Sequence, residues 1–288
     1  MMSHPSCLRK IATLCLLAAT LSAHAEVCGT NRHAALNELS GLAASRQNPG
    51  VLWVHNDSGD LPRLFAITPS GALLGTYTLA GAEAVDWEDI AIGRDPASGV
   101  DYLYVGDIGD NPATRASVAV YRVPEPVVDT AKLDTSNTLE GVECFPLVYE
   151  DGAHNAETLM IDPWTGDIIV MSKTKKKLPS GVYRAAYPHT THGTNALVPL
   201  VELPVGRLVA GDISPSGRQI LVKDYKHAWY FSRAPGQPLV SALTNKPSPL
   251  PYVIEEKGEA IGWDCNEQGY YTASEGLDQP IHHYVAPR

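Results

Sequence analysis

The sequence has no uninterrupted apolar stretch of about 20 residues, so no segment predicts a membrane-spanning helix. Basic residues are few: 22 Lys and Arg stand against 32 Asp and Glu, which gives a formal net charge of −10 at pH 7. Nucleic-acid binding requires a basic surface, so nucleic acid is excluded as an expected partner. The acidic excess favours a divalent cation or a cationic ligand. Low-complexity tracts are absent, and 24 Gly and 22 Pro are typical of a globular β protein with many turns.

Familiar catalytic motifs are also missing. The chain has no G-x-S-x-G elbow, no H-E-x-x-H and no phosphate-binding P-loop. No Cys or Ser lies in a context that would activate it as a nucleophile. The sequence therefore leaves open whether the protein is an enzyme.

The first 25 residues predict a signal peptide. Arg9 and Lys10 precede an apolar run over residues 11–21, and residues 23–25 (AHA) fit the small-x-small pattern of a cleavage site. We expect cleavage after Ala25, a single mature domain over residues 26–288, and export to a periplasm or to the medium.

One plan recurs five times along the chain. An acid opens an apolar strand, a turn with Pro or Gly follows, and a second strand ends in a charged residue. The opening acids are Glu38, Glu88, Glu157, Asp212 and Glu259. The charged residues that end the second strands are Asp57, Asp107, Lys173, Asp224 and Glu275. The repeats span about 50 to 70 residues, which matches the four antiparallel strands of a β-propeller blade.

The repeats predict an all-β protein with a single β-propeller of five four-stranded blades. The fifth blade reaches the end of the chain after its third strand. We therefore expect the segment from Val27 to Arg32 to supply its outer strand and close the ring, which leaves no free sheet edge there. Six blades is the alternative, with the additional blade within residues 124–156. We expect the protein to be a monomer.

Three cysteines remain after the predicted cleavage. In an oxidising compartment two of them are expected to pair. Cys28 and Cys265 fall in the same predicted blade, so we favour a bridge between them and a buried, unpaired Cys144. The alternative is three separate core thiols.

The repeated charges predict a site at one end of the propeller. The start of a first strand and the end of a second strand lie at the same edge of a blade, so a closed ring gathers nine carboxylates and Lys173 around the mouth of the central channel. Two carboxylates roughly 7 Å apart repel by about 2 kcal/mol at an effective dielectric near 20, and a bound cation would relieve this repulsion. Ca²⁺ accepts irregular sets of oxygen ligands more readily than Mg²⁺ does. The predicted ligands are Glu38, Asp57, Glu88, Asp107, Glu157, Asp212, Asp224, Glu259 and Glu275.

Two alternatives to a metal site remain. The acids could accept backbone N–H bonds from the neighbouring blade and so fix the packing between blades. They could also form a solvated rim.

Four further residues are candidates for catalysis or ligand binding. His55 and His154 fall near the acidic rim, where either could act as a general base beside a metal-held water; packed, hydrogen-bonded histidines are the alternative. Lys173 and Arg63 are the predicted anion-binding residues. Residues 173–177 (KTKKK) form the only basic run, and a phosphate ester held between Ca²⁺ and these lysines is one hypothesis; a solvated loop is the other.

Residues 38–43 (ELSGLA) together with 86–91 (DWEDIA) resemble the opening pattern of the SdiA-regulated family of exported bacterial propellers. The resemblance is clearest over residues 36–123. It implies a Ca²⁺-associated propeller of unsettled activity and supplies no catalytic residues. The plan is more distantly similar to propeller lactonases and phytases, which place Ca²⁺ at the channel mouth, but their ligand sets do not map onto this chain residue by residue.

Two functions follow as hypotheses. The favoured one is an exported propeller that binds Ca²⁺ and presents a face to a small-molecule or protein ligand, without turnover. The alternative is a Ca²⁺-dependent hydrolase of phosphate esters, carboxylic esters or lactones, with His55 or His154 as the base.

Overall fold

The computed structural model describes residues 25–286, and almost all of its regular structure is β-strand. The one helix in this range is α1 (Leu239–Leu243). The prediction of an all-β fold is confirmed. None of the described helices is long or apolar enough to span a membrane. The predicted signal peptide lies outside the described residues, apart from Ala25.

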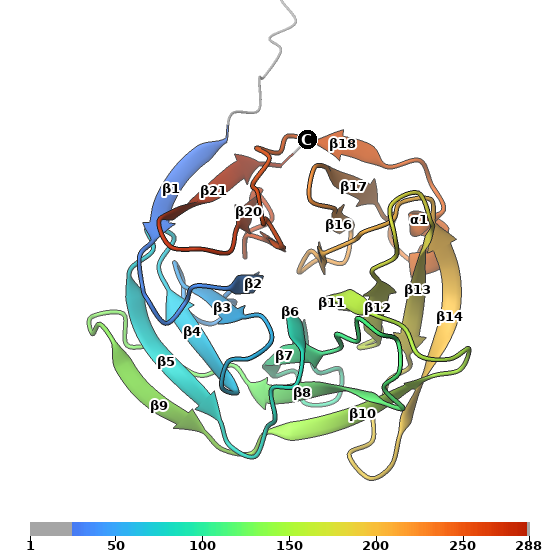
Figure 1. Ribbon diagram of the computed structural model, residues 1–288, viewed down its shortest axis with the longest axis horizontal. Coiled ribbons are helices and arrows are strands. Elements are labelled where there is room, and N and C mark those ends of the chain that lie inside the picture. Colours follow the sequence, from blue (N-terminus) through green and yellow to red (C-terminus); the bar gives the residue numbers. More distant parts are fainter. Residues whose placement is uncertain (1–24, 287–288) are drawn as a thin grey trace, which may run out of the picture.

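The strands form sheets arranged around a central axis, as in a β-propeller (Figure 1). The first sheet contains, in order across its width, β2 (Leu39–Ala44), β3 (Leu52–Asn56), β4 (Arg63–Ile67), β5 (Leu73–Leu79) and β9 (Thr135–Leu139). A sheet of four strands contains β15 (Ala210–Ile213), β16 (Gln219–Lys223), β17 (Ala228–Ser232) and β18 (Ser248–Leu250).

The largest sheet has eight strands because two groups of four share an outer edge. One group is β6 (Trp87–Arg94), β7 (Asp101–Asp107), β8 (Val118–Pro124) and β10 (Glu143–Tyr149). The other is β11 (Ala156–Ile161), β12 (Ile168–Ser172), β13 (Ser180–Ala185) and β14 (Asn195–Leu203). Strands β10 and β14 pair in parallel and join the groups. Residues 124–156, where the six-blade alternative places its additional blade, hold only β9 and β10 as complete strands.

The N-terminal strand pairs with the C-terminal one. Its sheet runs in the order β1 (Glu26–Asn31), β21 (Gln279–Val285), β20 (Gly269–Ala273) and β19 (Ala260–Trp263). Strand β1 also touches the turn between β4 and β5, because a Cβ atom added at Gly29 would lie 2.2 Å from the backbone carbon of Ser70. Only glycine allows this approach, so β1 contacts both the last and the first sheet.

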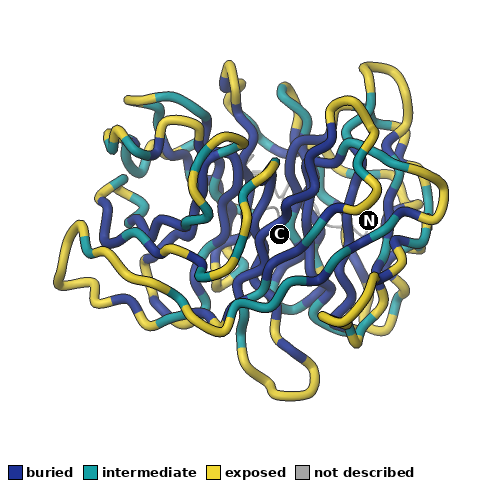
Figure 2. Tube along the Cα trace, turned by 60° about the horizontal axis from the view of Figure 1, so that its bottom comes forward, coloured by how far each residue is buried: buried dark blue, intermediate teal, exposed yellow. Residues whose placement is uncertain are grey.

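The innermost strands contact one another in a closed circle. β2 lies against β6, β6 against β11, β11 against β15, β15 against β19, and β19 against β2. Apolar side chains fill the space between neighbouring groups; Trp53 of β3 and Trp87 of β6, for example, belong to one buried cluster. Buried segments therefore line the interior, and exposed residues are confined largely to the loops (Figure 2).

Acidic side chains tie some of these inner strands together. The Asp89 carboxylate accepts the Leu159 N–H at 2.9 Å, which joins β6 to β11. The Asp212 carboxylate accepts the Trp263 N–H at 2.9 Å, which joins β15 to β19. The packing role that the sequence left open for the repeated acids is thus filled by Asp212, together with Asp89.

The predicted disulfide is wrong: Cys28, Cys144 and Cys265 are all free thiols in the described chain. Cys28 lies on the outermost strand of its sheet, whereas Cys265 lies in the turn that leads from β19 to β20. Neighbouring strands are about 4.8 Å apart, and bridged cysteines need Cα atoms within about 7 Å, so the intervening β21 keeps the two apart. Cys144 is half-buried rather than buried.

Candidate metal centre

Two β-bulges place glutamates at the channel mouth. The pairing of β6 with β7 shifts between Trp87 and Asp89, so Glu88 is the additional residue of a bulge. β11 has the same shift between Ala156 and Thr158, which makes Glu157 the additional residue there. A bulge re-aims a side chain that regular alternation would direct elsewhere. Both glutamates are buried, with 3% and 4% of their surface exposed.

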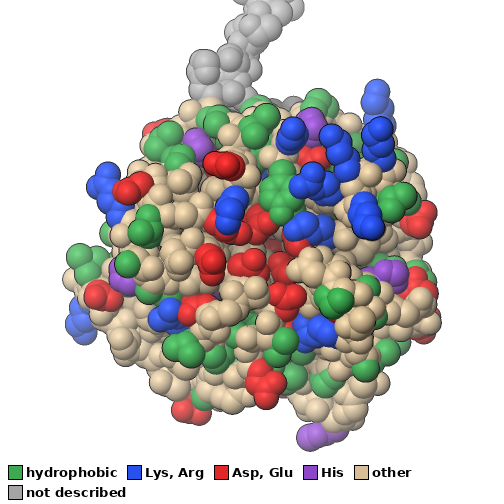
Figure 3. All heavy atoms as spheres, viewed as in Figure 1, with side chains coloured by type: hydrophobic (Ala, Val, Ile, Leu, Met, Phe, Trp, Pro, Cys, Tyr) green, Lys and Arg blue, Asp and Glu red, His purple; other side chains and the backbone are tan. Residues whose placement is uncertain are grey.

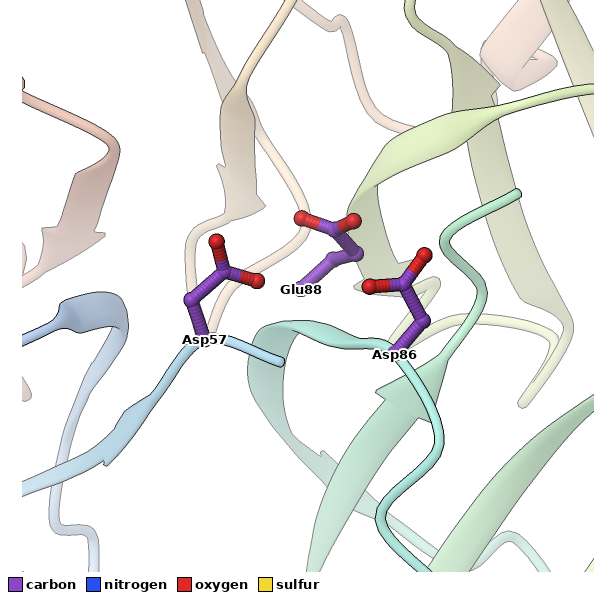
Figure 4. Close-up of side chains that lie close together, drawn as sticks. All are labelled: Asp57, Asp86 and Glu88. Atoms are coloured by element: carbon purple, nitrogen blue, oxygen red, sulfur yellow. The ribbon is translucent and has the colours of Figure 1, made fainter. Parts of the chain in front are cut away.

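Glu88 meets two aspartates at this mouth. Asp57 follows β3 and Asp86 precedes β6, and all three carboxylates point toward one another (Figure 4). One oxygen from each lies within 4.8 Å of the others, and a second group with the same spacing consists of Asp57, Glu259 and Glu275. We use the name acid cluster for Asp57, Asp86, Glu88, Glu157, Glu259 and Glu275. Acidic side chains gather at the centre of this face, with Lys and Arg on one side (Figure 3).

Cations of the protein compensate one half of the acid cluster. The Lys173 ammonium contacts the Glu157 carboxylate and lies 4.0 Å from that of Glu259. The same ammonium donates to the Tyr225 hydroxyl at 2.9 Å, and that hydroxyl in turn donates to Glu259. The Lys257 ammonium lies 2.6 Å from the Glu275 carboxylate.

The other half of the acid cluster consists of Asp57, Asp86 and Glu88. Among the described residues, no Lys, Arg or His nitrogen lies within 4.0 Å of the carboxylates of Asp57, Asp86 or Glu88. Burial, the main cause, raises the pKa of Asp57 and of Asp86. Burial together with the charges of Glu157 and Asp57 raises the pKa of Glu88 to about 11. These three convergent carboxylates, which we call the triad, are thus left without a positive charge in contact among the described residues.

The pKa values of the compensated glutamates are raised as well. Burial is again the largest cause, and the pKa rises to about 8 for Glu157 and about 7 for Glu259, in spite of Lys173. The folded protein therefore holds protons near neutral pH that the unfolded chain, with an ordinary carboxyl pKa of 4.5, has already released.

We predict that the cation-free protein loses stability as the pH rises. Because the folded pKa values exceed the unfolded value, the contribution of these groups is complete below pH 4.5 and is lost as the pH rises through about 7 and 8. Each group lowers the free energy of unfolding by about 1.4 kcal/mol per pH unit between its two pKa values. Urea unfolding in chelator at about pH 5.5 and about pH 8.5 measures this loss. If the free energy of unfolding depended on pH just as steeply with Ca²⁺ present, the prediction would be contradicted.

Within residues 25–286, two buried oxygens beside the triad lack hydrogen-bond partners. They are Oε2 of Glu157 and Oδ1 of Asp110. Asp110 is 2% exposed, and its charge contributes to the raised pKa of Asp86. A buried oxygen without a donor costs free energy, and a metal ion would remove that cost.

Gly109 forms one wall of the triad. A Cβ atom added there would lie 2.2 Å from Oε1 of Glu88 and 2.3 Å from Oδ2 of Asp86. Any side chain at this position would displace both carboxylates. The space in front of them is kept open by a glycine.

Replacing Gly109 with alanine is expected to weaken cation binding by roughly tenfold or more, since the ligand positions must be held within about 0.5 Å. Isothermal titration of the variant with Ca²⁺ measures this. Unchanged Ca²⁺ affinity in Gly109→Ala, with the variant folded, would exclude the triad as the site.

Four of the predicted ligands lie outside the acid cluster. Asp107 pairs with Arg115 at 2.7 Å and accepts the backbone N–H groups of Val85 and Asp86, so it holds the loop that carries Asp86. Glu38 is exposed to solvent. The remaining two have structural partners: Asp224 accepts the N–H groups of its own turn at 2.7 Å, and Asp212 bonds to β19.

The predicted histidines have other surroundings. His55 is fully buried beside the ring of Trp87, and burial lowers its pKa to about 4. His154 bonds to the Asp151 carboxylate at 3.0 Å and to the Tyr183 hydroxyl at 2.9 Å, which lie outside the acid cluster.

The predicted anion-binding residues both make ion pairs. Arg63 pairs with Asp60 at 2.7 Å and lies over the Phe65 ring. Lys173 is engaged within the acid cluster.

Two residues of the site were not among the predicted ligands or partners. Asp86 stands two positions before Glu88, in a run of three acids over residues 86–89 that signals more than one acid per repeat. Tyr225 follows Asp224 in the fourth repeat. Its hydrogen bond to Glu259 forms because the loop after β16 contacts the loop before β19. No local pattern marks it.

No family model matches the sequence, and no curated protein matches it, so the resemblance to the SdiA-regulated family has no support from these comparisons. Among solved structures, the chain is similar to a PQQ-bound aldose sugar dehydrogenase from Streptomyces coelicolor, with 12% identity, a TM-score of 0.48, and 91% and 98% of the two chains covered. The chain is also similar to an auxiliary nutrient binding protein from Bacteroides thetaiotaomicron, with 8% identity and a TM-score of 0.49; the match covers 91% of this chain and 76% of that protein. At such identities and TM-scores, neither likeness assigns a role to any residue or an activity to the chain.

Proposed function

We propose that this protein is a five-bladed β-propeller that binds a divalent cation at its channel mouth and uses the loaded face to bind a ligand. The closed circle of five inner strands supports the five blades, with the eight-stranded sheet counted as two and β9 as an added edge strand. The pairing of β1 with β21 supports closure of the ring by the N-terminal strand. Export and a monomeric state are part of the proposal and rest on the sequence.

The convergence of Asp57, Asp86 and Glu88 carries the proposal. Their carboxylates lie within 4.8 Å of one another, and no cation of the described chain contacts them, whereas the neighbouring half of the cluster has Lys173 and Lys257. Like charges at such distances repel strongly in a buried site. A metal ion is the group that this arrangement fits.

Ca²⁺ is the cation that we propose. All candidate ligands are carboxylate oxygens, contributed by the segment after β3 and by the start of β6, and Ca²⁺ accepts irregular sets of oxygen ligands more readily than Mg²⁺ does. Asp57, Asp86 and Glu88 would hold the ion. Asp110 and Glu157 offer unpaired oxygens nearby.

Ligand binding is the function that we favour over hydrolysis. A Ca²⁺-dependent hydrolase needs a base that reaches a metal-held water. His55 is buried behind Trp87, and the partners of His154 lie outside the acid cluster. Among the described residues, these two histidines give the hydrolase alternative no geometric support.

Unfolding in the presence and absence of metal tests the proposal. Ca²⁺ at about 100 times its dissociation constant is expected to raise the free energy of unfolding by about 2.7 kcal/mol over the chelated protein. Mg²⁺ is expected to give a smaller effect at equal concentration. An unchanged unfolding midpoint, together with no metal in elemental analysis of the purified protein, would contradict the proposal.

A further inference from the structure

A hollow lies beside the acid cluster, and basic residues outnumber acidic ones in its lining. Its volume is about 310 Å³, and Tyr225 forms the wall that it shares with the cluster. Three loops contribute a cation each to its lining: Lys176 between β12 and β13, Arg207 between β14 and β15, and Lys226 between β16 and β17. In Figure 3 Lys and Arg side chains gather on one side of the acidic centre.

These cations form no ion pair within the described part of the chain. None of Lys176, Arg207 and Lys226 has an acidic group within 4.0 Å among the described residues. Asp224 lines the same hollow, but its carboxylate accepts the Lys226 and His227 N–H groups of its own turn. Glu256 is the other acid of the lining and is exposed.

Two of the three loops that carry the cations are fixed to each other. A Cβ atom added at Gly206 would lie 2.5 Å from the carbonyl oxygen of Leu178 and 2.6 Å from that of Lys175, so only glycine fits between the two loops. The Arg207 N–H donates to the Thr174 carbonyl at 3.1 Å. Arg207 itself has a φ of 62°, a left-handed conformation that is uncommon outside glycine and is often found at ligand sites.

Tyr225 lies between this hollow and the acid cluster. The Arg207 guanidinium lies 5.0 Å from the centre of its ring, on which it stacks. The Tyr225 hydroxyl is bonded to Lys173 and Glu259. Arg207 is therefore oriented by an aromatic ring that the acid cluster holds in place.

We propose that this hollow, which we call the basic pocket, is an oxyanion site for a phosphate dianion, free or as a phosphate monoester. Three cations from three loops match the several oxygens of a phosphate, and the planar fork of Arg207 can bind two of them. A carboxylate, with one charge and two oxygens, would leave at least one of the cations unused. The site is distinct from the cation site and does not require metal.

Isothermal titration with inorganic phosphate, in chelator and at low salt, tests the basic pocket. The wild-type protein is expected to bind phosphate more tightly than acetate. Binding is expected to weaken as salt increases, because the cations are exposed. The double variant Lys176→Ala/Lys226→Ala is expected to lose roughly tenfold or more in phosphate affinity, and Arg207→Gln a similar factor. Lys132→Ala is the control, because Lys132 is an exposed lysine in the loop between β8 and β9, outside the lining of the hollow; this variant is expected to leave phosphate affinity unchanged.

The Glu88→Gln variant separates this proposal from the cation site. Phosphate binding that persists in Glu88→Gln supports the basic pocket, whether or not that variant still binds Ca²⁺. Binding that requires Ca²⁺ and disappears in Glu88→Gln would mean that the anion is held by the metal, and would overturn the proposal. Unchanged phosphate affinity in both basic-pocket variants, each shown to be folded by its unfolding midpoint, would overturn it as well. A titration with glycerol phosphate distinguishes monoesters from free phosphate.

Discussion

Replacing Lys173 with methionine is expected to lower the free energy of unfolding of the cation-free protein by about 3 kcal/mol or more at about pH 8. Lys173 is the cation that contacts Glu157 and lies near Glu259, and it also donates to Tyr225. Its removal leaves two buried carboxylates without compensation. Methionine keeps most of the length and volume of the lysine side chain, so the expected loss of stability comes from the missing charge rather than from lost packing. Urea unfolding in chelator measures the difference.

The expected loss depends on pH, and this dependence separates charge from packing. Below about pH 5 both glutamates are protonated in the folded protein, so the destabilisation is expected to shrink to about 1 kcal/mol. Lys257→Met is the matched control, because Lys257 also pairs with an acid of the cluster but has 66% of its side chain exposed. Exposed pairs contribute about 1 kcal/mol or less. Equal losses in the two variants would contradict the role given to Lys173.

Replacing Glu88 with glutamine is expected to weaken Ca²⁺ binding by roughly 100-fold or more, since the charge count of the ligands sets Ca²⁺ affinity over several orders of magnitude. The same variant is expected to be as stable as the wild type in chelator. Burial keeps the Glu88 carboxyl protonated, and therefore neutral, near neutral pH in the cation-free protein. The glutamine amide has nearly the same shape and is also neutral. Calcium titration and urea unfolding of one preparation measure both quantities.

Glu38→Gln is the control for Glu88→Gln. Glu38 is also a repeated acid at the start of an inner strand, but it is exposed and lies outside the acid cluster. Its replacement is expected to leave Ca²⁺ affinity within about twofold, because an exposed charge is screened by solvent. Strong loss of stability in chelated Glu88→Gln would show that the carboxylate ties strands together rather than holding a metal.

The repeat allowed much of the fold to be predicted. Hydrophobic alternation and hairpin turns define most of the strands, and the third and fourth strands follow from spacing. The strand β9 was not predicted, because residues 135–139 (TSNTL) are polar and largely exposed and pair only along one edge of β5. The repeat also predicts a fourth strand of the fourth blade between residues 239 and 254. That interval holds the short strand β18, as predicted, and before it the helix α1, which was not predicted because apolar residues over a short span fit either element.

The site could be predicted only in part, since aligning the repeats on their acids does not fix register. Glu88, Glu157 and Glu259 gather at the mouth as predicted from strand order. Asp212 does not, because β15 begins at Ala210 and places this acid two residues into the strand, opposite Leu221. Its carboxylate therefore reaches the Trp263 N–H of the next strand.

Loop contacts account for the remaining differences. Asp107 ends a second strand as predicted, but Arg115 approaches it from a loop whose path the sequence does not reveal. Asp86 joins the triad because the segment before β6 turns back over the mouth, held there by two N–H bonds to Asp107. Such contacts depend on tertiary structure rather than on local pattern.

The most direct test of the cation site is the position of a bound metal in a crystal of the protein grown with Ca²⁺ or Mn²⁺ and measured by anomalous scattering. The proposal predicts one peak at the channel mouth between the carboxylates of Asp57, Asp86 and Glu88, with Lys173 still bound to Glu157. No peak at saturating metal would contradict it. A peak between Asp57, Glu259 and Glu275 would contradict it too, because it would show that the metal displaces the protein's own cations instead of occupying the half of the cluster that lacks them.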